Sequence, residues 1–327
     1  MKRFLLFLLI TVQLHAQGQG KYGAFHGKRV LFIGIDGCRA DALLAAMERG
    51  LAPQMKMLSE SDDGLLTRKF YAGGEMGKPT HQPTVSGPGW TSLLTGVWMD
   101  KHGVKDNGFI GGRYQTFAHF MFRIKEVKPD AWCASFADWP PIHTKIADLS
   151  RLNDKEFLDE KFTATPDASR HYIDNPEKDI EVRDEALKSL RSCNADAMFV
   201  YFGQVDEFGH GATDSRASFS PDSTLYVNAI SHVDSHVGEL LRAMRAREKF
   251  AEEDWLVLIT TDHGGRGNRH GGDSDEERKI WLIAHGKDLP RERLLNEPTP
   301  QTAIVPMIYK HLGVTPKAEW NPEPQKP

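Results

Sequence analysis

The chain has 327 residues, of which 40% are hydrophobic and 26% are charged, as in ordinary globular proteins. Its formal net charge of −4, without a basic stripe, argues against a protein that coats nucleic acid, but not against nucleotides held through metal ions. Its three cysteines, Cys38, Cys133 and Cys193, are too few for a disulfide scaffold, so an apolar core must stabilise the fold. The sequence is compatible with a Cys133–Cys193 bridge and equally with buried free thiols.

The first residues follow the order of a signal peptide. Lys2 and Arg3 precede an apolar run that is too short to cross a bilayer, which takes about 20 residues, and Ala16 closes a cleavage-site pattern. We therefore expect residues 1–16 to be a signal peptide and residues 17–327 to be exported, to the periplasm or as a secreted protein. A buried N-terminal strand is the alternative. No cysteine directly follows the run, which argues against a lipid anchor there, and no later stretch is long and apolar enough for a membrane anchor.

Four apolar runs predict buried parallel strands, with a weaker fifth run between the first two. The four are residues 30–35, 197–202, 255–260 and 280–284, and the fifth is residues 131–136. Because helical patterns alternate with these runs, we expect an α/β fold with a mostly parallel central sheet sandwiched by helices.

Three stretches have the periodicity of amphipathic helices. They cover residues 223–247, 181–192 and 302–312, the last ending before Gly313. Residues 110–175 are irregular and rich in aromatic residues, and we interpret them as an insertion or cap within a single domain. Residues 315–327 contain four prolines and read as a surface tail.

Acidic and histidine residues follow three of the predicted strands. Asp36 follows the first strand, Asp206 and His210 follow the second, and Asp262 and His263 follow the third. Each of them alone is more simply a helix cap or turn residue. Because the carboxyl ends of parallel strands share one edge of a sheet, where ligands bind, the sequence brings these five residues to one place.

A sixth candidate, His270, lies in the loop that leads to the fourth strand. Alone, a histidine in a loop is more often merely solvated, but this loop reaches the same edge of the sheet. Asp and His ligands without thiolates suit zinc as a catalytic ion. Six such ligands are enough for two ions, each with positions left open for a substrate.

Ser86 stands at the predicted start of a helix, because Pro88 fits a first helical turn and Gly96 fits the position after the last turn. Its simplest role is that of a helix cap. A helix start also offers free N–H groups and a positive dipole end, which suit a phosphate. A metal ion at the hydroxyl would lower its pKa and make it a nucleophile.

This set of residues resembles the alkaline phosphatase superfamily, and within it the nucleotide pyrophosphatase/phosphodiesterase branch. The motifs keep the family's order from about residue 28 to residue 312. They are Ile35-Asp36-Gly37, Ser86-Gly87-Pro88 with Ser92-Leu93-Leu94-Thr95-Gly96, His102-Gly103-Val104 with Asn107, Asp206-Glu207-Phe208-Gly209-His210, Thr261-Asp262-His263-Gly264, and His270-Gly271. Each motif is modest, but the ordered set is specific.

The resemblance implies two Zn²⁺ ions, with Mn²⁺ or another divalent ion as an alternative, and a serine nucleophile. Ser86 would attack phosphorus and form a phosphoseryl intermediate, and Asn107 would donate a hydrogen bond to a phosphoryl oxygen. The two ions would offset the charge of the transferred group, and the second would support the leaving oxygen and then activate a water. The implied ligands of one ion are Asp36, Ser86, Asp262 and His263, and those of the other are Asp206, His210 and His270.

The chain departs from the family pattern at three positions. The nucleophile is Ser86, where the phosphodiesterase branch usually has threonine, and Gly89 replaces an asparagine of many members. Trp90 stands where sulfatases need an arginine for making formylglycine, which argues against a sulfatase.

The leading hypothesis is a phosphodiesterase or pyrophosphatase acting on small, nucleotide-like diesters. No arginine can be assigned to a dianionic phosphate, which favours diesters over the alternative of a phosphomonoesterase. A non-catalytic binding protein on the same scaffold is a third reading. We further expect His232 and His236 to be exposed. Tyr114 and Trp139 are candidates for a slot that takes a base or an aryl group. The sequence leaves the oligomeric state open.

Overall fold

A computed structural model of the chain describes residues 23–150, 156–164, 177–192, 194–211, 214 and 216–320, so the expected signal peptide lies outside the described residues. The strands form one sheet in the order β4-β3-β5-β1-β6-β7-β2-β8. Their bounds are β1 Lys28–Ile35, β2 Gly64–Tyr71, β3 Cys133–Ala137, β4 Glu160–Thr163, β5 Ala197–Phe202, β6 Asp254–Thr260, β7 Lys279–His285 and β8 Thr299–Pro300.

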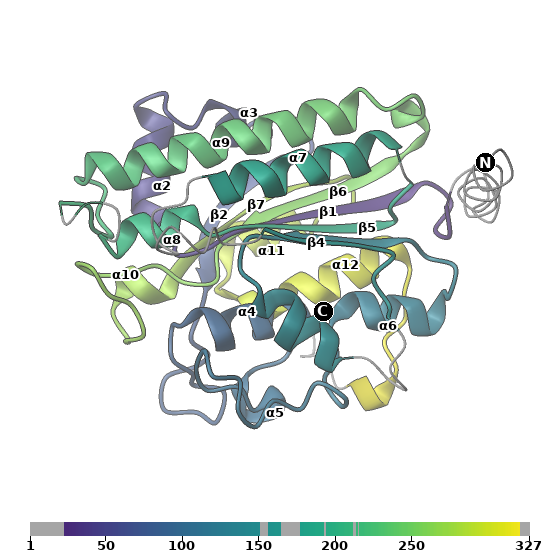
Figure 1. Cartoon of the computed structure of the whole chain (residues 1–327), viewed down its shortest axis with the longest axis horizontal. Coiled ribbons are helices and arrows are strands. Elements are labelled where there is room, and N and C mark those ends of the chain that lie inside the picture. Colours follow the sequence, from purple (N-terminus) through teal and green to yellow (C-terminus); the bar gives the residue numbers. More distant parts are fainter. Residues whose placement is uncertain are drawn as a thin grey trace, which may run out of the picture.

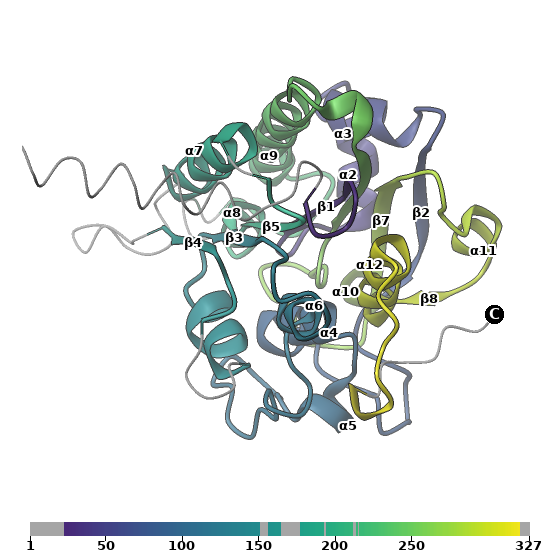
Figure 2. The same ribbon diagram turned by 90° about the vertical axis from the view of Figure 1, so that its right-hand side faces the viewer.

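Helices cover both faces of this sheet (Figures 1 and 2). One face carries α2 (Ala40–Glu48), α3 (Pro53–Ser59), α7 (Glu177–Ser192) and α9 (Thr224–Arg245). The other carries α4 (Ser86–Thr95), α6 (Phe120–Val127) and α12 (Ile304–Leu312). The other α-helices among the described residues are short: α5 (Met99–His102), α8 (Gln204–Gly209), α10 (Asp275–Arg278) and α11 (Arg291–Asn296).

The core consists of two apolar layers, one on each side of the sheet. Strand β1 contributes to both, because successive side chains of a strand point to opposite faces. Val30 and Phe32 pack in the layer under α4, α6 and α12, whereas Leu31 and Ile33 pack in the layer under α2 and α9. Each fully buried side chain of this kind contributes about 1.5–3 kcal/mol. The central strands therefore read as continuous apolar runs.

The expected α/β architecture with a mostly parallel sheet is confirmed, but one strand runs the other way. Strand β7, expected to be parallel, is antiparallel to both of its neighbours, β6 and β2. The cause is the connection from β6, which stays at the carboxyl edge of the sheet, whereas a parallel strand needs a crossover that returns to the opposite edge. Strands β2, β4 and β8 were not predicted from the sequence.

Residues 110–175 are not all irregular, because β3 and β4 of this range form one edge of the main sheet. The part of the tail that the structure describes ends in a short 3-10 helix whose Trp320 is buried against Tyr309. Cys133 is a buried free thiol, and Cys193 lies outside the described residues. Among the described helices, none has the length and apolarity needed to cross a bilayer.

Candidate metal centre

The ends of three central strands bring the candidate residues together. Asp36 directly follows β1, and Asp262 and His263 follow β6 after one residue. Asp206 lies in α8 and His210 caps its end, one turn later, just beyond β5. These three strands are neighbours in the sheet and parallel to one another, so their carboxyl ends meet.

Ser86 is the first residue of α4 and points at this edge instead of capping the helix. The capping position belongs to Val85, and no side chain caps this end. The Ser86 hydroxyl lies 3.4 Å from Asp36 Oδ1 and 3.3 Å from His263 Nε2. The free N–H groups expected at this helix start are fewer than the sequence suggested, because Pro88 has none and Gly87 donates to Asn107.

The three histidines are held in the same way, each through its Nδ1 atom. The Nδ1 atoms of His210, His263 and His270 lie 2.9, 2.8 and 2.9 Å from the backbone carbonyl oxygens of Asn268, Gly264 and Thr84. A carbonyl can only accept, so each Nδ1 carries a proton and each Nε2 is the ring atom left to meet a metal ion. This is the tautomer and support that metal-binding histidines generally have.

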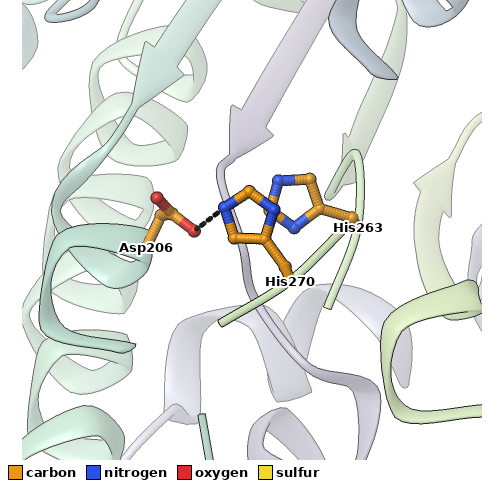
Figure 3. Close-up of side chains that lie close together, drawn as sticks. All are labelled: Asp206, His263 and His270. Carbon is orange, nitrogen blue, oxygen red and sulfur yellow. Dashed lines mark ion pairs between the residues drawn. The ribbon is translucent and has the colours of Figure 1, made fainter. Parts of the chain in front are cut away.

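One group of ligand atoms joins Asp206, His263 and His270, with all atoms within 4.8 Å of one another. Figure 3 shows the two imidazole rings facing each other, with the Asp206 carboxylate beside His270. The ring centroids of His263 and His270 are 4.0 Å apart, and His270 Nε2 lies 3.7 Å from Asp206 Oδ1. His210 also joins this group, with its Nε2 atom 3.3 Å from Asp206 Oδ2 and its ring centroid 4.8 Å from that of His270.

A second group of ligand atoms joins Asp36, Asp262 and His263, which are all buried. His263 Nε2 lies 3.4 Å from Asp36 Oδ1 and 3.3 Å from Asp262 Oδ2. The structure thus brings all seven residues expected at a metal site to one edge of the sheet. Because His263 belongs to both groups, the two possible ion positions are adjacent.

The charges of this centre are poorly balanced by the protein itself. Burial, together with the charge of Asp206, raises the pKa of Asp36 to about 7, and burial and both neighbouring carboxylates raise the pKa of Asp262 well above its ordinary value. Burial, the largest effect, opposes ionisation of Asp206, but its hydrogen bond with His210 and the nearby histidines together outweigh burial and hold its pKa at about 2. Burial lowers the pKa of His263 to about 3, so this ring is neutral.

A divalent cation fits this arrangement. Among the described residues, Asp206 Oδ1 and Asp262 Oδ2 are buried atoms without a hydrogen-bond partner, which is costly unless a ligand meets them. Three carboxylates and three imidazoles that turn Nε2 toward them, without a thiolate, are a donor set that suits a catalytic zinc ion. The residues therefore suit one or two such ions.

Asn107 is exposed and lies beside the start of α4. Its side-chain oxygen accepts a hydrogen bond of 2.7 Å from the backbone N–H of Gly87, next to Ser86. With the oxygen engaged in this way, the N–H₂ group of the amide is left to donate to another molecule.

Two residues at the centre were not recognised as site residues from the sequence. The Trp90 indole donates a hydrogen bond of 2.8 Å to Asp36 Oδ2, and the Tyr201 hydroxyl donates to the same oxygen. Trp90 had appeared only as a departure from the sulfatase pattern, and Tyr201 only as part of an apolar strand. The sequence offers only one indication of their role, which is that each lies within five residues of a candidate ligand or nucleophile.

Other residues singled out in the sequence lie outside the centre, and several of them are buried. His102 is fully buried, and its Nε2 atom bonds to the Ser92 hydroxyl of α4 at 3.0 Å. Tyr114 is also buried and bonds to Thr91, so it cannot line an open slot, whereas Trp139 is half-buried against Tyr201. The expected exposure of His236 is wrong.

The environments of His236 and His232 differ because α9 packs along α7. His236 lies on the flank of α9 that faces α7, where it is buried near Arg183 and against the ring of Phe202. His232, four residues earlier, is exposed as expected.

Residues 30–276 match the family model described as type I phosphodiesterase/nucleotide pyrophosphatase. The matched stretch is more than half of the chain and includes all the candidate ligands, from Asp36 to His270. The resemblance stated from the sequence motifs is thereby confirmed.

Several solved structures share the fold. A 2-O GAG sulfatase superposes with a TM-score of 0.65 at 15% identity, covering 89% of this chain and 72% of that chain. The phosphonate monoester hydrolase of Agrobacterium radiobacter gives a TM-score of 0.61 at 15% identity, covering 88% and 74%. The zinc complex of the C-terminal periplasmic domain of EcEptC from Escherichia coli gives 0.59 at 13% identity, covering 90% and 84%. At such identities the likeness concerns the fold alone.

Proposed function

Because the chain belongs to the type I phosphodiesterase/nucleotide pyrophosphatase family, we propose that it is a two-metal hydrolase of small phosphate esters, most active on diesters or pyrophosphates. The observation that carries this proposal is the meeting of the Ser86 hydroxyl with three carboxylates and three Nε2 atoms at one sheet edge. Neither a serine that caps a helix nor a serine packed in the core requires carboxylates and imidazoles around its hydroxyl.

The proposed ligands divide between two neighbouring positions. Asp36, Ser86, Asp262 and His263 would hold one Zn²⁺ ion, and Asp206, His210 and His270 would hold the other. When bound, such ions lower the pKa of a hydroxyl or water and offset the charge of a transferred phosphoryl group.

The chain's own residues then have separate tasks. Ser86 attacks phosphorus, the ester oxygen leaves as an alcohol or phosphate, and a phosphoseryl group remains on Oγ. A water cleaves this intermediate and restores the serine hydroxyl. The Asn107 amide donates a hydrogen bond to a phosphoryl oxygen, and its bond to Gly87 N keeps it beside the nucleophile. Hydrogen-bond donors fixed in this way contribute strongly to transition-state stabilisation.

The preference for diesters rests on charge. A monoester presents a dianion and needs a further cationic group, and the motifs that form the site contain no arginine that can be assigned to this role. A phosphomonoesterase with the same metal site is the alternative, and specificity would depend on the segment 110–175. We also propose that residues 1–16 direct export, which N-terminal sequencing of the protein isolated from an exporting host would check.

The decisive experiment compares three chromogenic esters in the presence of zinc: a phosphate diester, a phosphate monoester and a sulfate ester. We expect the diester to be the best substrate and Ser86→Ala to lower its turnover by several orders of magnitude, as when a nucleophile is removed elsewhere. A monoester preference that still depends on Ser86 would keep the mechanism and reject the diester proposal. Equal activity of the wild type and Ser86→Ala on every ester would reject the nucleophile.

A further inference from the structure

The two oxygens of the Asp36 carboxylate have different surroundings. Oδ2 accepts hydrogen bonds from the indole of Trp90, at 2.8 Å, and from the hydroxyl of Tyr201. Oδ1 instead lies 3.4 Å from both the Ser86 hydroxyl and His263 Nε2. A carboxylate oxygen has about two lone pairs, so the two donors occupy Oδ2 and leave Oδ1 for the centre.

We propose that Trp90 and Tyr201 are positioning residues, which restrict Asp36 to binding a metal ion through Oδ1 alone. This inference rests on the proposed function, since it concerns the ion assigned to Asp36, Ser86, Asp262 and His263. Single-oxygen binding keeps the ion on the side of Asp36 where Ser86 stands, whereas binding through both oxygens would pull the ion away from the serine.

Both donors are fixed by their packing. Trp90 and Tyr201 are fully or almost fully buried, and their ring centroids lie 4.9 Å apart in an edge-to-face arrangement. Trp90 also rests directly on the backbone of β1, since a Cβ added to Gly34 would come within 2.3 Å of its ring. Neither ring can swing away without disturbing the core, so the hydrogen bonds are built into the fold.

The support is specific to one side of the centre. Asp206, on the other side, has no such pair of donors among the described residues: Oδ2 faces His210 at 3.3 Å, and Oδ1 is without a hydrogen-bond partner. Loss of the Tyr201 hydroxyl should therefore affect the ion at Asp36 and spare the ion at Asp206.

Trp90 adds a second connection, because it lies on the same helix as the nucleophile. Ser86 and Trp90 are the first and fifth residues of α4. One turn of this helix therefore carries both the attacking oxygen and the donor that holds the neighbouring carboxylate. The helix and the ligand are thereby fixed relative to each other.

The test is zinc binding by the full protein, measured by competition with a chromophoric chelator. Tyr201→Phe removes only the hydroxyl and keeps the ring. We expect it to weaken one of the two bound ions by about 10- to 100-fold, as when supporting partners of metal ligands are lost elsewhere, and to leave the other unchanged. The visible spectrum of the Co²⁺-loaded protein should change for the weakened site. Trp90→Phe should weaken the same ion.

The matched control is Tyr114→Phe, which removes a buried tyrosine hydroxyl that bonds to Thr91 of α4 at 2.9 Å but reaches no ligand. It should bind both ions like the wild type. Unchanged binding in Tyr201→Phe, or an equal loss of both ions, would overturn the inference while the wild type still binds two ions. A wild type without zinc would instead reject the proposed function and, with it, the inference.

Discussion

At the scale of single residues, Asn107 connects the nucleophile to the substrate in the proposed reaction. Its oxygen is committed to the Gly87 N–H at 2.7 Å, so only its N–H₂ group can serve a phosphoryl oxygen. The same side chain thus stabilises the start of α4 and presents a donor beside Ser86. These two roles can be separated, because aspartate has the same shape and keeps the acceptor but lacks the donor.

We expect Asn107→Asp to retain the melting temperature of the wild type and to lose catalysis. Removal of one donor to a developing negative charge costs about 10²- to 10³-fold in kcat, and the added negative charge should weaken the substrate further. The measurement is steady-state kinetics on the diester together with a thermal melt. Asn107→Ala, which loses both donor and acceptor, should in addition melt earlier. A fully active Asn107→Asp enzyme would show that the amide does not act on the substrate.

The candidate ligands could be predicted from the sequence, whereas their supports could not. Asp36, Asp206 and Asp262 each follow an apolar strand, and strand ends meet at one edge whatever the details of the packing. Tyr201 and Trp90 support Asp36 only because their side chains point at it from β5 and α4. That direction depends on how α4 and β5 pack on β1, which no local pattern encodes.

At the scale of elements, a buried ion cluster joins α7, α8 and the end of β3. Lys178, in the first turn of α7, forms an ion pair with Glu207 of α8 at 2.5 Å and lies 3.6 Å from Asp138, which follows β3. Asp179 is also buried and accepts from the backbone N–H of Gly203. Burial, together with the charge of Asp138, raises the pKa of Glu207 to about 8. The cluster thereby supports the helix that carries Asp206.

We expect Lys178→Met to be strongly destabilising, because it leaves buried carboxyl groups without their cation. Removal of one partner of a buried ion pair costs about 3–5 kcal/mol. Lys188→Met is the control on the same helix, since Lys188 is exposed and pairs with Glu185 at the surface, and it should not change stability measurably. Chemical denaturation of the three proteins gives the comparison. Equal stability of both variants would contradict the proposed support of α8.

Strands could be predicted from the sequence where both of their faces are buried. Strands β1, β5 and β6 are buried almost throughout and appear as continuous apolar runs. Strand β2 escaped prediction because its centre contains Thr67, Arg68 and Lys69, two of which are exposed, and its pairing shifts at a bulge there. The direction of β7 depends on the path of the chain between two strands, and its apolar run is the same for either direction.

At the scale of the whole molecule, the metal-free fold raises the pKa values of several carboxyl and histidine groups. In the folded protein the pKa of Asp36 is raised to about 7 and that of Glu207 to about 8, chiefly by burial. Bonding to Asp206 raises the pKa of His210 to about 9. For all three groups the folded state binds protons more tightly than the unfolded state, so the stability that they contribute is lost as the pH rises through these values.

We therefore expect the metal-free protein to lose stability between about pH 6.5 and pH 9, mainly through His210 and Glu207, because the loss from Asp36 is complete by about pH 7. One pKa unit corresponds to about 1.4 kcal/mol for a buried group and to less for the exposed His210. Zinc should reverse this trend, because a bound ion takes the place of the protons, so the stabilisation by zinc should grow with pH. Thermal melts in a chelator and in zinc across this range provide the measurement. His210→Gln should flatten the chelator series, because the raised pKa of His210 spans this range, and a metal-free stability that rises with pH would contradict the assignment.

The way in which the three histidines are held has a consequence for how this centre can change during evolution. Their Nδ1 atoms all bond to backbone carbonyl oxygens, of Asn268, Gly264 and Thr84. Every residue type carries such an oxygen, so a point substitution at these three positions does not delete the acceptor. The hydrogen bonds to Asp36, by contrast, come from side chains that a single codon change can remove. Heritable tuning of the centre's metal preference should therefore concentrate at Trp90 and Tyr201.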